Sequence, residues 1–226
     1  MNSRVFPHAT ISIVAILVGL TTFAQAGPPL ICHPIEIGRA RSLPWVDLNY
    51  KKGSGSYDLK NLTRDTLAIL DSNTPVLVRM ETLRRATLYA RQDPPGAKEL
   101  LTRLHARAAN SDAAGQSEAL AWFDVGYLAE AYKQWIGKDE PNPASGFDGY
   151  SWVEKALSLR GQDPEMEFAA ALITLAGPES DHREHVQKAI AGAKNDPLLT
   201  QNLASNFNRQ TISELLTNAT AGGFKK

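Results

Sequence analysis

Two short clusters combine residue types that bind metals. Cys32 and His33 are adjacent, and a thiolate beside an imidazole is a ligand pair for zinc, copper or haem iron. His182 and His185 stand three positions apart, which is about one helical turn, so both side chains are expected on one helix face. Cys32, His33, His182 and His185 are therefore the candidate metal ligands of this chain.

Each cluster also has a structural interpretation. A haem attachment motif is absent because position 29 is proline, and one adjacent pair supplies only two of the four ligands of a closed zinc site. Cys32 is the only cysteine, so it either packs under a covering segment or forms a disulfide with another chain. The histidine pair lacks the His-Glu-x-x-His spacing and also fits a solvated helix start. We expect no cofactor.

A run of arginines and a group of aromatic residues predict a binding surface. Six arginines lie between positions 79 and 107, and on stacked helices they would form a basic groove for an acidic peptide or a glycan; the alternative is an ordinary solvated face. Trp122 and Tyr132 fall off the main apolar stripe of their helix and are expected beside a loop at 137–150. The predicted partner contacts are Arg84, Arg91, Trp122 and Tyr132.

The sequence carries no local motif for catalysis or for nucleotide binding. We find no Gly-x-Ser-x-Gly elbow, no phosphate loop and no dinucleotide glycine pattern. Lys plus Arg and Asp plus Glu number 24 each, so the formal net charge is zero. That balance argues against a nucleic-acid partner, whose phosphates require a basic protein surface. We expect a protein that is not an enzyme.

From Tyr57 onward, the spacing of apolar residues predicts helices and no strands. Asp58 is expected to cap a first helix, and Thr74-Pro75 to open a second. Asp163 is expected to cap the helix that begins at Pro164. The other expected helices cover 94–110, 114–136, 151–159 and 180–193, followed by two shorter ones that reach position 220.

The N-terminus predicts export. Arg4 precedes an apolar stretch at 9–24, and the small-x-small motif Ala24-Gln25-Ala26 is typical of a signal-peptide cleavage site, so residues 1–26 are expected to be removed. Residues 27–56 are rich in proline and apolar side chains, which predicts an extended arm that docks on the helices and ends in a Gly/Ser hinge at 53–56. Membrane contact is expected only through the signal peptide, and residues 221–226 are expected to be disordered.

Asp-Pro pairs begin at positions 93, 163 and 196, and the last two are 33 residues apart. The segment from Glu154 through Asp163-Pro164 to Leu172 resembles the junction between tetratricopeptide repeats, where an Ala-Leu helix ends before a proline and an Ala-rich helix follows. The resemblance implies an all-α fold over 57–220, a right-handed array of stacked antiparallel helix pairs; the alternative is an irregular helical bundle.

Export and a helical array together predict a protein-interaction scaffold of the bacterial cell envelope, located in the periplasm or outside the cell. Its partner would be a protein or a peptide bound on the surface of the array. The alternative function is a metal- or thiol-linked envelope protein that uses Cys32 and His33.

Overall fold

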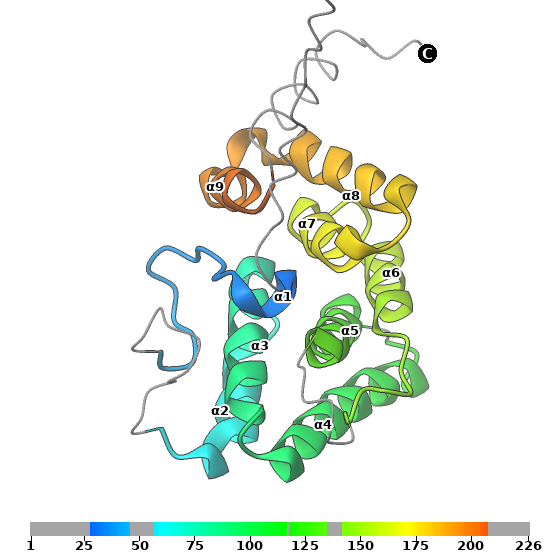
Figure 1. The fold of residues 1–226 in the computed structure, drawn as a ribbon. Coiled ribbons are helices and arrows are strands. Elements are labelled where there is room, and N and C mark those ends of the chain that lie inside the picture. The colour runs from blue at the N-terminus through cyan, green and yellow to red at the C-terminus, as the bar shows by residue number, and fades with distance from the viewer. Residues whose placement is uncertain (1–27, 46–56, 117, 135–141, 208–226) are drawn as a thin grey trace, which may run out of the picture.

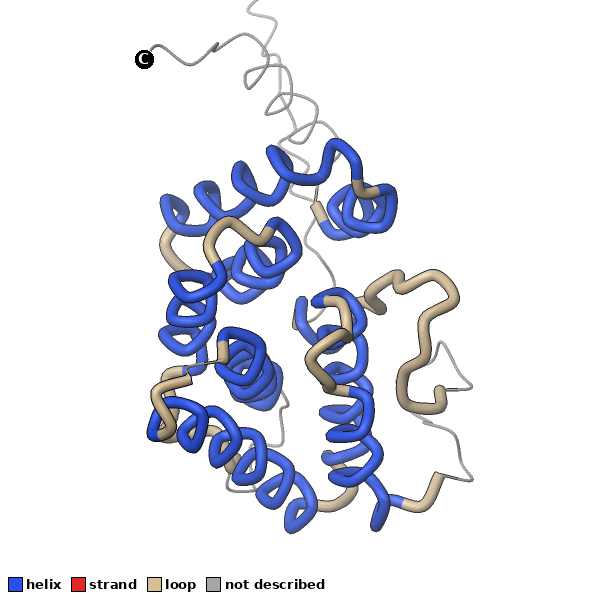
Figure 2. Tube along the Cα trace, turned by 180° about the vertical axis from the view of Figure 1, so that it is seen from behind, coloured by secondary structure: helices blue, strands red, loops and turns tan. Residues whose placement is uncertain are grey.

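The computed structural model describes residues 28–45, 57–116, 118–134 and 142–207, and within these ranges it contains helices and loops but no strand (Figures 1 and 2). The prediction of an all-helical chain is confirmed there. Three 3₁₀ turns accompany the α-helices, at Leu59–Asn61 (η1), Thr174–Ala176 (η2) and Ala193–Asn195 (η3). The α-helices are α1 (Pro29–Cys32), α2 (Leu62–Ile69), α3 (Val76–Ala90), α4 (Pro94–Ala113), α5 (Ala119–Gln134), α6 (Gly149–Arg160), α7 (Pro164–Ile173), α8 (Glu179–Gly192) and α9 (Pro197–Asn206).

The Asp-Pro pairs mark helix starts. The carboxylates of Asp93, Asp163 and Asp196 each accept a hydrogen bond from a main-chain N–H in the first turn of the helix that follows, α4, α7 and α9 respectively. In each case the proline is the first helical residue, where its missing N–H costs nothing. Asp58 caps η1 in the same way, by accepting from the N–H of Lys60.

Several helix boundaries differ from the prediction. The hydroxyl of Thr74 donates to the carbonyl of Ile69 at 2.5 Å instead of capping, and α3 begins at Val76, one residue after Pro75. Helix α4 continues to Ala113, and Gly115 then turns the chain with φ +68°. The helix expected at 114–136 therefore begins at Ala119, because a residue with positive φ ends a right-handed helix whatever the propensity of its neighbours.

Helices α3 and α5 form the centre of the molecule. In Figure 1 the other helices are arranged around α5, which contacts α3, α4, α6 and α7. Helix α5 is buried around its circumference from Ala121 to Ala129. The backbones of α5 and α6 approach closely: a Cβ atom added at Gly126 would lie 2.6 Å from the carbonyl oxygen of Gly149.

The described part of the arm, residues 28–45, lies along α3 (Figures 1 and 2). It begins with the short helix α1 and continues as loop. Five apolar side chains of this segment are buried in the main core: Leu30, Ile31, Ile35, Ile37 and Leu43. Because the arm covers the face of α3 that the other helices leave open, nearly every residue of α3 is buried.

The expected signal peptide (1–26), the Gly/Ser hinge (53–56), the last expected helix and the C-terminal tail (221–226) lie outside the described residues. Among the helices that are described, none combines the length and the apolar content that crossing a membrane requires. Helix α4 is the longest at 20 residues, and it is amphipathic, with Ala97, Leu100 and Leu104 buried.

Candidate functional site

Side chains of the helical body hold the main chain of the arm. A segment outside regular secondary structure leaves its N–H and C=O groups unpaired, and these groups need partners when they are buried. Asn202 on α9 supplies two: its Oδ1 accepts from the N–H of Glu36 at 2.8 Å, and its Nδ2 donates to the carbonyl of Glu36 at 2.9 Å. The amide of Asn202 thus recognises one residue of the arm through its backbone alone.

The N-terminal part of the arm, which includes the short helix α1, is also held through its main chain by α3 and α5. Glu81 Oε2 accepts from the N–H of Ile35 at 2.9 Å, and Arg84 Nη1 donates to the carbonyl of Ile31 at 3.1 Å. Gln134 Oε1, at the end of α5, accepts from the N–H of Leu30 at 2.7 Å. None of these contacts depends on the identity of an arm side chain.

At the other end of the arm, Arg85 Nη1 donates to the carbonyl of Leu43 at 2.5 Å, and the hydroxyl of Tyr89 donates to the carbonyl of Pro44. We call the surface that makes these contacts the arm groove. It consists of Glu81, Arg84, Arg85, Tyr89, Gln134 and Asn202.

The charges of the arm groove compensate one another. Glu81 accepts from Arg84 Nε at 2.7 Å and Nη2 at 2.9 Å, and from Arg85 Nε at 2.7 Å. Glu81 and Arg84 are each 1% exposed, so the pair is tolerated in the interior because both ions are hydrogen-bonded. The ion pairs also orient both side chains toward the arm. In this orientation Glu81 accepts from the N–H of Ile35, and Arg84 donates to the carbonyl of Ile31.

Three of the four predicted partner contacts do not lie on the surface. Arg84 is buried in the arm groove, Tyr132 is fully buried, and Trp122 is 7% exposed with its indole N–H donating to Asp112 Oδ1 at 2.9 Å. Only Arg91 is exposed. The expectation for Trp122 and Tyr132 rested on a helix with one buried face, whereas α5 is surrounded by other helices.

The six arginines do not form one basic groove. Arg79 is buried and pairs with Asp124 at 2.5 Å, while Arg84 and Arg85 belong to the arm groove. Arg107 Nη1 donates to the carbonyl of Leu70 at 2.6 Å. The alternative of an ordinary solvated face does not describe Arg79 and Arg84 either, because both are buried.

The structure places the candidate histidines in separate environments. His185 is buried, and both ring nitrogens are engaged: Nδ1 lies 2.5 Å from Glu167 Oε2, and Nε2 lies 2.7 Å from the hydroxyl of Tyr150. His182 Nδ1 instead lies 2.9 Å from the carbonyl oxygen of Ala171. No lone pair of His185 remains for a metal in this arrangement.

Cys32 and His33 lie at the end of α1, half-buried. Burial raises the pKa of the Cys32 thiol, and the positive charges of Arg84 and Arg91 oppose that shift only in part. Burial and Arg84 both lower the pKa of His33. Within the described ranges, no group of three or more histidine, cysteine, aspartate or glutamate side chains is placed to hold a metal ion.

Sequence reasoning missed the chain Glu167–His185–Tyr150, which links α6, α7 and α8, and it missed the arm groove. A signal for the groove does exist. Glu81, Arg84 and Arg85 stand at i, i+3 and i+4 spacing, which predicts ion pairs between these side chains, although it does not indicate that an arm covers them. Nothing local to Asn202 connects it with Glu36.

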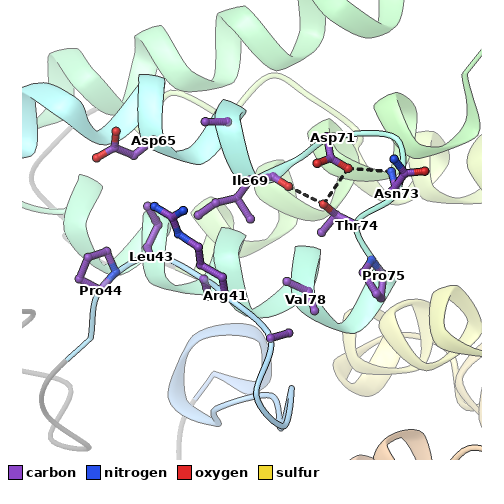
Figure 3. Close-up of a pocket in the computed structure, with 13 residues that line it drawn as sticks. Arg41, Leu43, Pro44, Asp65, Ile69, Asp71, Asn73, Thr74, Pro75 and Val78 are labelled. Carbon is purple, nitrogen blue, oxygen red and sulfur yellow. Dashed lines mark hydrogen bonds between the residues drawn. The ribbon is translucent and has the colours of Figure 1, made fainter.

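A third feature that the sequence did not indicate is a cleft of about 550 Å³ between the arm and the α2–α3 connection (Figure 3). The arm contributes residues 40–44, and the helical body contributes residues from α2, the connection and the start of α3. Its volume lies within the range of small-ligand pockets, roughly 300–1,000 Å³.

Comparison of the chain with protein-family models, curated proteins and solved structures finds no match.

Proposed function

We propose that this protein is a non-enzymatic interaction scaffold of the bacterial cell envelope that binds an extended segment of a partner protein in the arm groove. One observation carries the proposal. The hydrogen bonds from the groove to the arm go to backbone atoms, with Asn202 pairing both the N–H and the C=O of Glu36. Such contacts suit any extended segment that brings apolar side chains at suitable positions.

The architecture in this proposal is a degenerate tetratricopeptide-like array. In its support, consecutive helices pack on one another, above all α5 with α6 and α7 with α8 (Figure 1). Proteins of this kind bind extended segments on surfaces built from successive helices. The proposed location outside the cytoplasm rests on the N-terminal sequence alone, with its apolar stretch and its Ala24-Gln25-Ala26 motif.

The arm is then the intramolecular occupant of the groove. A tethered segment has an effective concentration in the millimolar range, so a partner segment must compete with it or bind when it is weakened. Ile35 is the position at which to weaken it. Its side chain is 3% exposed, and its N–H bonds to Glu81, so an aspartate there would place a second carboxylate beside Glu81.

The test uses the exported form of the chain, recovered from the periplasm of an expressing bacterium, and a fluorescent synthetic peptide of residues 28–45. We expect the Ile35→Asp chain to bind this peptide at least roughly 10-fold more tightly than the unaltered chain, because its own arm competes less well. Glu36→Gln is the matched control, since the Glu36 side chain is exposed. Fluorescence anisotropy measures the affinities.

Adding Asn202→Ala to the Ile35→Asp chain should weaken peptide binding again, because it removes both bonds to Glu36. Should the Ile35→Asp chain lose its helical circular dichroism, Ile37→Asp takes its place, since Ile37 is 9% exposed and lies nearer the surface. A folded chain with a weakened arm that binds no peptide would show that residues 28–45 are a permanent part of the core, and the proposal would fail.

A further inference from the structure

The cleft beside the arm has apolar walls and a polar rim. Its apolar lining comes from both sides: the arm supplies Ala40, Leu43 and Pro44, and the helical body supplies Ala68, Ile69, Pro75 and Val78. Arg41 extends from the arm toward α2, whereas Asp71, Asn73 and Thr74 lie together at the other end (Figure 3). The cleft exists only while the arm is docked, because the arm forms one of its walls.

The carboxylates of the cleft are already satisfied by their own neighbours. Asp71 Oδ1 accepts from the N–H of Asn73 at 2.7 Å and from the hydroxyl of Thr74 at 3.2 Å, and these bonds lower the pKa of Asp71. Asp65 accepts from the hydroxyl of Tyr57 at 3.0 Å and pairs with Arg64 at 2.9 Å. Neither carboxylate needs a ligand to complete its hydrogen bonds.

Arg41 differs from them. It is the only lysine or arginine that lines the cleft, and among the described residues its guanidinium has no hydrogen-bond or ion-pair partner. The guanidinium offers a planar fork of donors that matches a carboxylate. Because this fork has no partner among the described residues, it is complementary to a ligand that joins a carboxylate to an apolar body.

We propose that this cleft binds such a ligand, with its carboxylate on Arg41 and its apolar part between Leu43, Ile69 and Val78. Two sources share this chemistry: the C-terminus of a polypeptide that ends in an apolar residue, and a free acyl acid. At the far end, Asp71 can accept a further hydrogen bond from a ligand N–H, which only the polypeptide offers. The inference does not require exchange of the arm.

The test is calorimetric titration of the unaltered exported chain with two pairs of probes. One pair is acetyl-Ala-Leu-Leu with a free carboxylate and the same peptide with a C-terminal amide. The other pair is decanoate and decanol. We expect at least one carboxylate to bind roughly 10- to 100-fold more tightly than its neutral counterpart, the size of effect that a hydrogen bond to a charged group produces.

Arg41→Glu should abolish that preference and lower the affinity for the carboxylate by a similar factor. Arg39→Glu is the matched control, because Arg39 is an exposed arginine two positions away that does not line the cleft. Binding of the peptide acid alone identifies a chain terminus as the source, and binding of decanoate alone identifies an acyl acid. Equal binding of acid and neutral probes, no binding of either acid, or an Arg41→Glu chain that binds like the unaltered one overturns the proposal.

The calorimetric titration of the cleft and the peptide-binding experiment on the arm groove can succeed or fail independently of each other. The cleft is tested with the arm in place, whereas the groove is tested with the arm weakened by Ile35→Asp. Loss of carboxylate binding in the Ile35→Asp chain is expected in addition, since Arg41 and Leu43 would no longer be held against α2 and α3.

Discussion

The interface between the arm and α3 and the interface between α5 and α6 are both buried, yet they are built from different types of residue. The first contains the ions Glu81, Arg84 and Arg85. The second brings two glycines, Gly126 and Gly149, into contact. A helix satisfies its own backbone, so two helices can pack through small residues alone, whereas an irregular segment must find partners for its N–H and C=O groups.

The comparison teaches that the buried polar residues of α3 serve segments without regular structure: Glu81 and Arg84 hold the arm, and Arg79 holds the carbonyl of Thr74 in the α2–α3 connection. We call these residues and their partners the polar region. If so, polar changes around α3 and steric changes between α5 and α6 should fail in different ways. The following predictions test that difference, beginning with the largest expected effect.

Arg79 offers the severest test of the polar region. It is fully buried, pairs with Asp124 at 2.5 Å and donates from Nε to the carbonyl of Thr74 at 3.0 Å. Arg79→Met should lower the free energy of unfolding by about 3–5 kcal/mol, because it leaves a buried carboxylate uncompensated. The double variant with Asp124→Leu should recover much of that loss in urea denaturation. A single variant that costs less than about 1 kcal/mol would contradict a paired interior.

At Gly126 and Gly149, the α5–α6 contact should respond to the size of the side chain. A Cβ atom at Gly126 would lie 2.6 Å from the carbonyl oxygen of Gly149, and one at Gly149 would lie 2.5 Å from the carbonyl oxygen of Gly126. Each change to alanine should cost about 1–3 kcal/mol, because the helices must separate.

Gly146→Ala is the control for this prediction, since a Cβ atom there would meet nothing within 4 Å. Its thermal transition should stay close to that of the unaltered chain. If Gly126→Ala were instead stabilising, as alanine is in an open helix, the close approach of α5 and α6 would be wrong.

Asn202 tests the contacts to the arm. Asn202→Ala removes the acceptor and the donor that pair with Glu36, 166 positions away in the sequence, and should cost about 1–2 kcal/mol. The amide hydrogen of Glu36 should also exchange faster with solvent. Gln201→Ala, on the exposed side of the same helix, should change stability by less than about 0.5 kcal/mol and leave that amide unaffected.

The contrast between these regions also explains what the sequence could predict. Helix starts depend on neighbouring residues, so Asp163 was correctly predicted to cap α7. The full burial of α3 depends on an arm that is remote in the sequence, so Arg84 was expected on the surface and lies inside. Likewise, the bond between Asn202 and Glu36 has no local signal.

The histidine pair shows a second limit of prediction from the sequence. A spacing of three residues predicts a shared helix face, and His182 and His185 do both lie on α8. However, their rings bond to different groups: His185 to Glu167 and Tyr150, and His182 to the carbonyl of Ala171. The spacing in the sequence determines the helix face on which the two side chains start. The packing of α6 and α7 against α8 determines which groups the two imidazole rings contact.

The last expected effect is a slope, and it concerns how stability changes with pH around the buried pair of Arg79 and Asp124. Burial raises the pKa of Asp124 to about 6 in spite of Arg79, from about 3.8 for the free group. The folded state then binds a proton more tightly than the unfolded state, so the stability gained by protonation is full below pH 3.8 and is lost as the pH rises to about 6. Between these values the free energy of unfolding should fall by up to about 1.4 kcal/mol per pH unit through this group.

Asp124→Asn should remove that contribution to the slope, while Gly126→Ala should leave it in place because this substitution changes no charge. Urea denaturation at several pH values between 4 and 7 measures both slopes. At pH 7 and above, the unaltered chain and the Asp124→Asn chain should run parallel, since Asp124 is then largely ionised in the folded and the unfolded state alike. Parallel curves already at pH 4–6 would mean that Arg79 keeps Asp124 ionised there, and the pair would then stabilise the fold most at neutral pH.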